Sequence, residues 1–136
     1  MGFGTIKLDK NDVLFSTMIR ERDGEKCQFC PKTALQGWRM TNSHFWGRAD
    51  KIHRFDPKNC DTLCFTCHTN NEGNKQGFYR EWKLKQLGKK VYEQMEKDHY
   101  QKTKKYGKHE AEILYAILKE QYKNKDHLKK DWSVVW

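Results

Sequence analysis

The sequence predicts an α+β fold in which a small core rich in cysteine and histidine lies between helical segments. Apolar residues recur at helical spacing near the N-terminus and again beyond residue 74. Between residues 26 and 74, short apolar runs alternate with Cys, His, Asn, Gly and aromatic residues, a composition typical of turns and a short hairpin. With 136 residues, the chain is expected to form one domain, residues 1–136.

The N-terminal part of the predicted fold is one amphipathic helix followed by the hairpin. The helix is expected over residues 9–22, where Asp9 or Asn11 can cap its first turn and Asp23 with Gly24 can end it. The hairpin is expected over residues 35–55. The apolar face of the helix consists of Val13, Leu14, Met18 and Ile19.

The C-terminal part, residues 76–136, is expected to be a helical extension. Helical spacing predicts one helix that ends at Gly88, a second around residues 91–99 and a third over residues 111–122. The apolar positions that define these helices are Phe78, Tyr79, Trp82, Leu87, Val91, Tyr92, Met95, Ile113, Leu114, Ile117 and Leu118.

Composition points to a small core and a polyanionic partner. Only 36% of the residues are hydrophobic and 33% are charged. A chain of this length and composition is expected to need a bound metal or a cross-link to stabilise its small core. The net charge of +9 attracts polyanions through its long-range field and through counterion release from phosphates. A basic charge is equally compatible with an ordinary solvated surface, so charge alone makes nucleic acid a candidate partner only.

The chain carries no sign of membrane insertion or secretion. No apolar run reaches the length that crosses a bilayer, and residues 1–10 lack the apolar segment of a signal peptide. We therefore expect no membrane partner and a cytoplasmic location. In that reducing compartment, five cysteines favour metal binding over disulfides.

Two C-x-x-C pairs are the strongest motif in the sequence. Four thiolates from two tight turns are the tetrahedral ligand set of structural zinc. A redox role for C-x-x-C is the alternative, but two pairs without a βαβ pattern argue against it. The remaining cysteine, Cys60, is expected to be a small buried residue. The four predicted zinc ligands are Cys27, Cys30, Cys64 and Cys67.

Between and just after these pairs, three residues fit the chemistry of phosphodiester hydrolysis. His44 has the intrinsic pKa of a general base that takes a proton from water. His68, next to the last cysteine, can hold a divalent ion that neutralises the leaving oxygen. Asn59 can orient the base.

The order His44, Asn59, His68, braced by two C-x-x-C pairs, resembles the HNH nuclease family over residues 23–75. The resemblance implies a treble-clef-like ββα-metal core held by structural zinc. It also implies that His44 activates water, Asn59 orients the site, and His68 binds a catalytic Mg²⁺, Mn²⁺ or Ni²⁺ ion. Cleavage in that family leaves a 3′-hydroxyl and a 5′-phosphate.

A narrower likeness is to phage recombination nucleases of the NinG (Rap) type, which act on branched DNA. It rests on His44-Phe45, on Arg54-Phe55-Asp56-Pro57-x-Asn59 and on Gly73-Asn74. Two positions depart from these patterns. His68 lies where the narrower group usually has Asn. Ser43 lies where many HNH enzymes have a second metal ligand, and Asp50, His53 or Asn71 could supply that ligand instead.

The expected function is that of a metal-dependent DNA endonuclease of a bacterium or a phage-infected host. Its expected substrate is double-stranded DNA, with branched DNA as a candidate form. Arg48 and Arg54 are the expected phosphate contacts, because a guanidinium binds a phosphate through two parallel hydrogen bonds. A non-catalytic zinc-finger DNA-binding module is the main alternative, and an RNA-directed nuclease is a weaker one.

Overall fold

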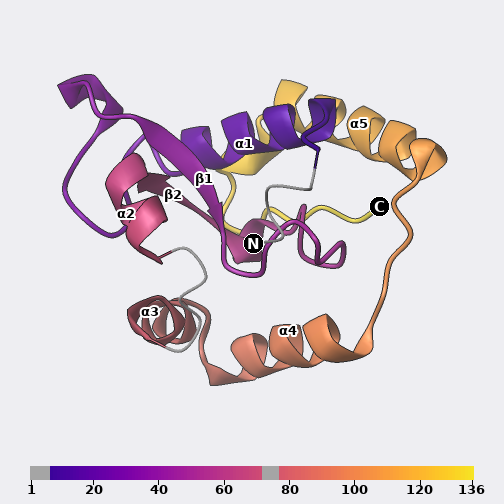
Figure 1. Cartoon of the computed structure of the whole chain (residues 1–136). Coiled ribbons are helices and arrows are strands. Elements are labelled where there is room, and N and C mark those ends of the chain that lie inside the picture. Colours follow the sequence, from indigo (N-terminus) through magenta and orange to yellow (C-terminus); the bar gives the residue numbers. More distant parts are fainter. Residues whose placement is uncertain (1–6, 72–76) are drawn as a thin grey trace.

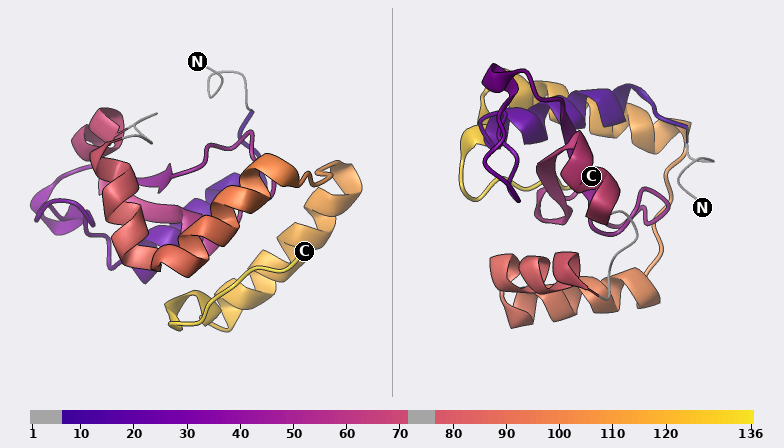
Figure 2. Two further views of the ribbon diagram at one scale, coloured as in Figure 1. Left: turned by 90° about the horizontal axis from the view of Figure 1, so that it is seen from below. Right: turned by 60° about the vertical axis from the view of Figure 1, so that its left-hand side comes forward.

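The computed structural model describes residues 7–71 and 77–136. Within these residues the chain forms five α-helices and a two-stranded antiparallel sheet, so the predicted α+β class is confirmed. The sheet and the loop that joins its strands lie between two helical layers, with α1 and α5 on one side and α3 and α4 on the other (Figures 1 and 2). None of the described helices is long and apolar enough to cross a membrane.

Helix α1 (Lys10–Arg22) begins where the sequence predicts it. The Asp9 carboxylate accepts a hydrogen bond from the Asp12 amide (3.0 Å), and the Asp12 carboxylate accepts one from the Asp9 amide (2.9 Å). This reciprocal capping satisfies two amides that the first turn leaves unpaired. Helix α1 packs against α5 (Lys108–Lys123), although Val13 of the predicted apolar face is 63% exposed. Their shared core contains Phe15, Met18, Ile19, Phe55, Cys60, Leu114, Leu118 and Trp132.

The sheet differs from the predicted hairpin over residues 35–55. Strand β1 (Met40–His44) lies in that range, but its partner β2 (Cys60–Cys64) follows a long connection, residues 45–59, which we call the central loop. The strands pair antiparallel, with Met40 opposite Cys64 and His44 opposite Cys60. All of β2 is buried, so it lacks the alternation of buried and exposed residues by which a strand is recognised in a sequence.

Polar residues of β2 are buried because each finds a partner. The Asp61 carboxylate accepts hydrogen bonds from Lys83 Nζ (2.8 Å) and from Gln86 Nε2 (2.7 Å), both on α3. The Thr62 amide donates to the Asp23 carboxylate just after α1 (2.9 Å). The strand is thus anchored to both helical layers through polar contacts.

Helix α2 (Phe65–Asn71), which helical spacing did not predict but which a ββα core would include, follows β2 directly and packs against both strands. The predicted C-terminal helices are confirmed as α3 (Phe78–Leu87), α4 (Lys89–Gln101) and α5. Gly88 separates α3 from α4 with a φ of +84°, a conformation that costs glycine little. A second core between the sheet and this layer contains Phe45, Trp46, Tyr79, Tyr92 and Met95.

Candidate functional site

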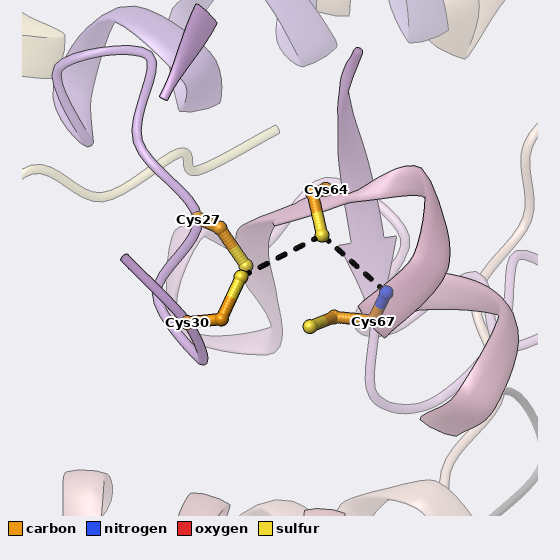
Figure 3. A group of neighbouring side chains, drawn as sticks. All are labelled: Cys27, Cys30, Cys64 and Cys67. Carbon is orange, nitrogen blue, oxygen red and sulfur yellow. Dashed lines mark hydrogen bonds between the residues drawn. The ribbon is translucent and has the colours of Figure 1, made fainter. Parts of the chain in front are cut away.

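The four predicted zinc ligands come together at one end of the sheet (Figure 3). Cys27 and Cys30 lie in the turn after α1, Cys64 ends β2, and Cys67 lies in the first turn of α2. All four sulfurs lie within 4.8 Å of one another, and Cys30 Sγ is 3.8 Å from Cys64 Sγ. Sulfurs at the corners of a zinc tetrahedron are separated by roughly 3.8 Å. The cluster could therefore coordinate a structural metal such as zinc.

Backbone hydrogen bonds position these thiols. The Cys27 amide donates to the Lys32 carbonyl (3.0 Å) and closes the turn, and the Gln28 amide donates to the Thr62 carbonyl (2.9 Å), which ties the turn to β2. The Cys67 amide donates to Cys64 Sγ (3.5 Å). Burial raises the pKa of Cys64, but this hydrogen bond and those from the neighbouring thiols outweigh it and lower the pKa to about 7. The pKa values of Cys30 and Cys67 are raised, in both cases chiefly by burial, so Cys64 is the thiol of these three that ionises first.

His44, the last residue of β1, is held as a neutral imidazole in one tautomer. Its Nε2 lies 2.9 Å from the Arg54 carbonyl oxygen, which can only accept, so Nε2 carries the hydrogen. The lone pair of the neutral ring is then on Nδ1. Burial of the ring and the nearby charge of Arg48 lower the pKa of His44 to about 3, so the ring is neutral at physiological pH.

His68, on α2, has the opposite tautomer. The Thr41 hydroxyl donates its hydrogen to the Leu63 carbonyl (2.8 Å), so at its 2.8 Å contact with His68 Nδ1 it must accept. Nδ1 of His68 is therefore protonated, which leaves the lone pair of a neutral ring on Nε2. The two histidines lie near enough for a charge on His68 to lower the pKa of His44.

Asn59 is fully buried and organises the central loop. Its side-chain oxygen accepts from the Trp46 amide (2.8 Å), and its Nδ2 donates to the carbonyls of Trp46 (2.9 Å) and His53 (3.0 Å). Arg54, the residue after His53, supplies the carbonyl that fixes the tautomer of His44. Asn59 thus holds the loop whose backbone carbonyl contacts His44.

The two candidate phosphate-binding arginines differ in their surroundings. Arg54 is buried and forms a two-pronged contact with Asp12, from Nε to Oδ1 (3.0 Å) and from Nη2 to Oδ2 (2.6 Å). Its guanidinium is therefore committed to holding the central loop against α1. Arg48 lies 3.8 Å from the same carboxylate, its side chain is 24% exposed, and its Nε has no hydrogen-bond partner among the described residues. Arg48 is the better placed of the two to receive an anion.

Of the residues considered as replacements for Ser43, Asn71 lies on α2 three residues after His68, whereas Asp50 and His53 belong to the central loop. The Ser43 hydroxyl contacts the Tyr79 hydroxyl (3.0 Å), and Asn71 Nδ2 donates to the Cys67 carbonyl (2.8 Å). Asp50 and His53 form a separate cluster with His99. Gly73 and Asn74, part of the narrower likeness, and the last residues of the expected 23–75 core lie outside the described residues.

Sequence reasoning missed Thr41, the Arg54 carbonyl and His99. Thr41 alone left a signal, since it lies three residues before His44 in the same strand, whereas a backbone carbonyl and a contact across the fold leave none. Comparisons of the chain with protein-family models, curated proteins and solved structures found no match.

Proposed function

We propose that the protein is a metal-dependent DNA endonuclease of the HNH type, built on a treble-clef-like ββα core. The observation that supports this most directly is the pair of opposite histidine tautomers. A neutral His44 with its lone pair on Nδ1 has the form of a general base. A neutral His68 with its lone pair on Nε2 has the form of a metal ligand, and Thr41 is the outer partner that such ligands require.

The four-cysteine cluster has a structural role in this proposal. Zinc bound by Cys27, Cys30, Cys64 and Cys67 would join the turn after α1 to the end of β2 and the start of α2. Because α2 carries His68 and β2 pairs with the strand that carries His44, this staple would fix the two histidines relative to each other. Structural zinc contributes about 10–16 kcal/mol of apparent binding energy to small domains.

In the proposed reaction, His44 Nδ1 accepts a proton from the water that attacks phosphorus. The ring becomes an imidazolium, and its Nε2–H remains bonded to the Arg54 carbonyl, which stabilises the new charge. A divalent ion at His68, such as Mg²⁺, Mn²⁺ or Ni²⁺, would supply positive charge to the phosphate and the leaving oxygen. As the resemblance implies, the products would be a 3′-hydroxyl and a 5′-phosphate.

Arg48 completes the proposed site as the phosphate contact. In the ligand-free protein burial of the ring, and after it the charge of Arg48, holds the pKa of His44 at about 3, below the value that suits a base acting near pH 7. A phosphate bound at Arg48 would offset that charge and raise the pKa of His44. The base would thereby gain proton affinity only when substrate is bound.

DNA is the proposed substrate because the chain carries a net charge of +9 and a base and cation site suited to phosphodiesters. The likeness to NinG-type nucleases extends the proposal to branched or recombination DNA. A phage or a bacterial host would be the setting, and the cytoplasm the location, of such an enzyme.

The test is a plasmid-nicking assay with zinc-loaded protein and added Mg²⁺, Mn²⁺ or Ni²⁺. We expect wild type to nick, His44→Ala to lose nicking by at least about 100-fold, and both to bind DNA equally. His109→Ala, an exposed histidine on α5, is the matched control and should nick like wild type. If no protein nicks with any metal while all bind DNA, the zinc-finger binding module replaces the nuclease.

A further inference from the structure

A second group of metal-ligating side chains lies apart from the residues assigned above. Asp50 and His53 belong to the central loop, and His99 lies in the last turn of α4. Asp50 Oδ2 is 2.6 Å from His53 Nδ1 and 2.7 Å from His99 Nδ1. The carboxylate can only accept, so both imidazoles present Nδ1–H to it, and a metal ion bound here would replace those two hydrogens.

The surrounding structure orients all three donors. Asp50 Oδ1 accepts from the amides of Ile52 (2.9 Å) and His53 (3.2 Å), which turns the other oxygen toward the imidazoles. The Trp46 ring stacks on His53 at 5.0 Å and on His99 at 5.8 Å between centroids. Partners that fix the orientation of ligands in this way are characteristic of metal sites in proteins.

The cluster is closed on the protein side and open on the other. The side chains of Asp50 and His53 are 4% and 2% exposed, whereas that of His99 is 30% exposed. His99 and Asp50 line a cavity of about 380 Å³. Three lysines also line it: Lys102 pairs with Asp98 (3.2 Å), Lys104 contacts the Trp136 carbonyl, and Lys51 is exposed to solvent. The cavity gives a cation a route of entry and gives water a place in the coordination shell.

We propose that Asp50, His53 and His99 bind a divalent transition-metal ion of the zinc class. Two imidazoles and one carboxylate, with water in a fourth position, form an open tetrahedral set that suits Zn²⁺. Ligand atoms around such an ion are separated by roughly 3.3 Å, so the nitrogens of His53 and His99, now 2.6 and 2.7 Å from Asp50 Oδ2, must each move away by about 0.6–0.7 Å. The partly exposed His99 can move with the last turn of α4, whereas the buried His53 must shift within the central loop.

The ion would act as a latch between α4 and the central loop. Among the helices and strands, α4 packs chiefly against α3, and Figure 1 shows it at the edge of the fold. A metal bond through His99 would fasten its last turn to the loop that Asn59 and the Arg54 carbonyl organise. This site does not depend on the proposed nuclease activity, because it uses none of the residues assigned to base, catalytic ion or cysteine cluster.

Metal content of the full-length protein tests the proposal. After equilibration at micromolar free Zn²⁺ and removal of excess, elemental analysis should find about two zinc ions per chain in wild type. His99→Ala and Asp50→Asn should each hold about one, and His109→Ala should hold as many as wild type. A wild-type content of one ion, or two ions retained in His99→Ala, would overturn the proposal.

Cobalt separates the two sites spectroscopically. The first equivalent of Co²⁺ should enter the cysteine cluster and give a strong sulfur-to-metal charge-transfer band. The second should add visible absorption without more of that band, because its ligands are nitrogen and oxygen. This second increment should be absent in His99→Ala, while the charge-transfer band, which reports an intact cysteine cluster, stays. A second increment that survives the substitution contradicts the assignment.

Discussion

Asn59 provides the most direct test of how the fold supports the base. Asn59→Ala would remove three hydrogen bonds between a fully buried side chain and the central loop, all between 2.8 and 3.0 Å. Each such bond contributes roughly 1 kcal/mol net, and the abandoned amide and carbonyls add a desolvation penalty. We therefore expect the free energy of unfolding to fall by about 3–4 kcal/mol, together with a loss of nicking because the Arg54 carbonyl is no longer held against His44.

Urea denaturation followed by tryptophan fluorescence measures this change in zinc-loaded protein. The matched control is Asn124→Ala, since Asn124 is exposed and makes one weak side-chain hydrogen bond to Glu120 (3.3 Å); it should lower stability by no more than about 0.5 kcal/mol. If Asn59→Ala lowers the free energy of unfolding by less than about 1 kcal/mol, or leaves nicking intact, then Asn59 does not hold the central loop against His44.

Three further predictions concern the histidines and the metal. Thr41→Val should weaken binding of the catalytic ion by about 10-fold or more, because it removes the acceptor that fixes the His68 tautomer; calorimetric titration with Mn²⁺ measures it, and unchanged affinity would contradict it. The pKa of His44, lowered to about 3, predicts a ring that stays neutral with hydrogen on Nε2 from pH 8 to pH 5; nitrogen NMR should find no protonation step near pH 6.5. Since the unfolded state binds the extra proton in the window from about 6.5 down to 3, the contribution of His44 to stability must fall as pH falls. Removal of zinc by a strong chelator should unfold the segment around the cysteine cluster, which circular dichroism would detect as a loss of helix that added zinc restores.

Local patterns account for what the sequence could predict. The Asp9 cap, the ends of α3 and the two C-x-x-C pairs each depend on residues within one or two turns of each other. Strand β2 escaped prediction because its burial depends on distant partners, above all the pairing of Asp61 with Lys83. An aspartate in a strand normally indicates a position exposed to solvent. Only the fold shows that Lys83 pairs with Asp61 and that both are buried.

The sequence indicated the candidate side chains of the site but not the contacts that orient them. His44, Asn59 and His68 were found because a spacing and a resemblance pointed to them. The tautomer of His44 is set by a backbone carbonyl, which every residue possesses and which therefore leaves no mark in a sequence. His99 reaches Asp50 across 49 residues, a contact that helical periodicity in α4 cannot indicate.

Asp12 joins the fold to the proposed site. Its carboxylate caps α1, forms a two-pronged contact with Arg54 and lies 3.8 Å from Arg48. Because Arg54 takes both oxygens at hydrogen-bonding distance, Arg48 is left with only a distant counterion. Buried ion pairs of this kind add little net stability but fix one arrangement of their partners. The same pair that anchors the central loop to α1 therefore leaves Arg48 available for the proposed phosphate contact, so one carboxylate would serve both the fold and the proposed site.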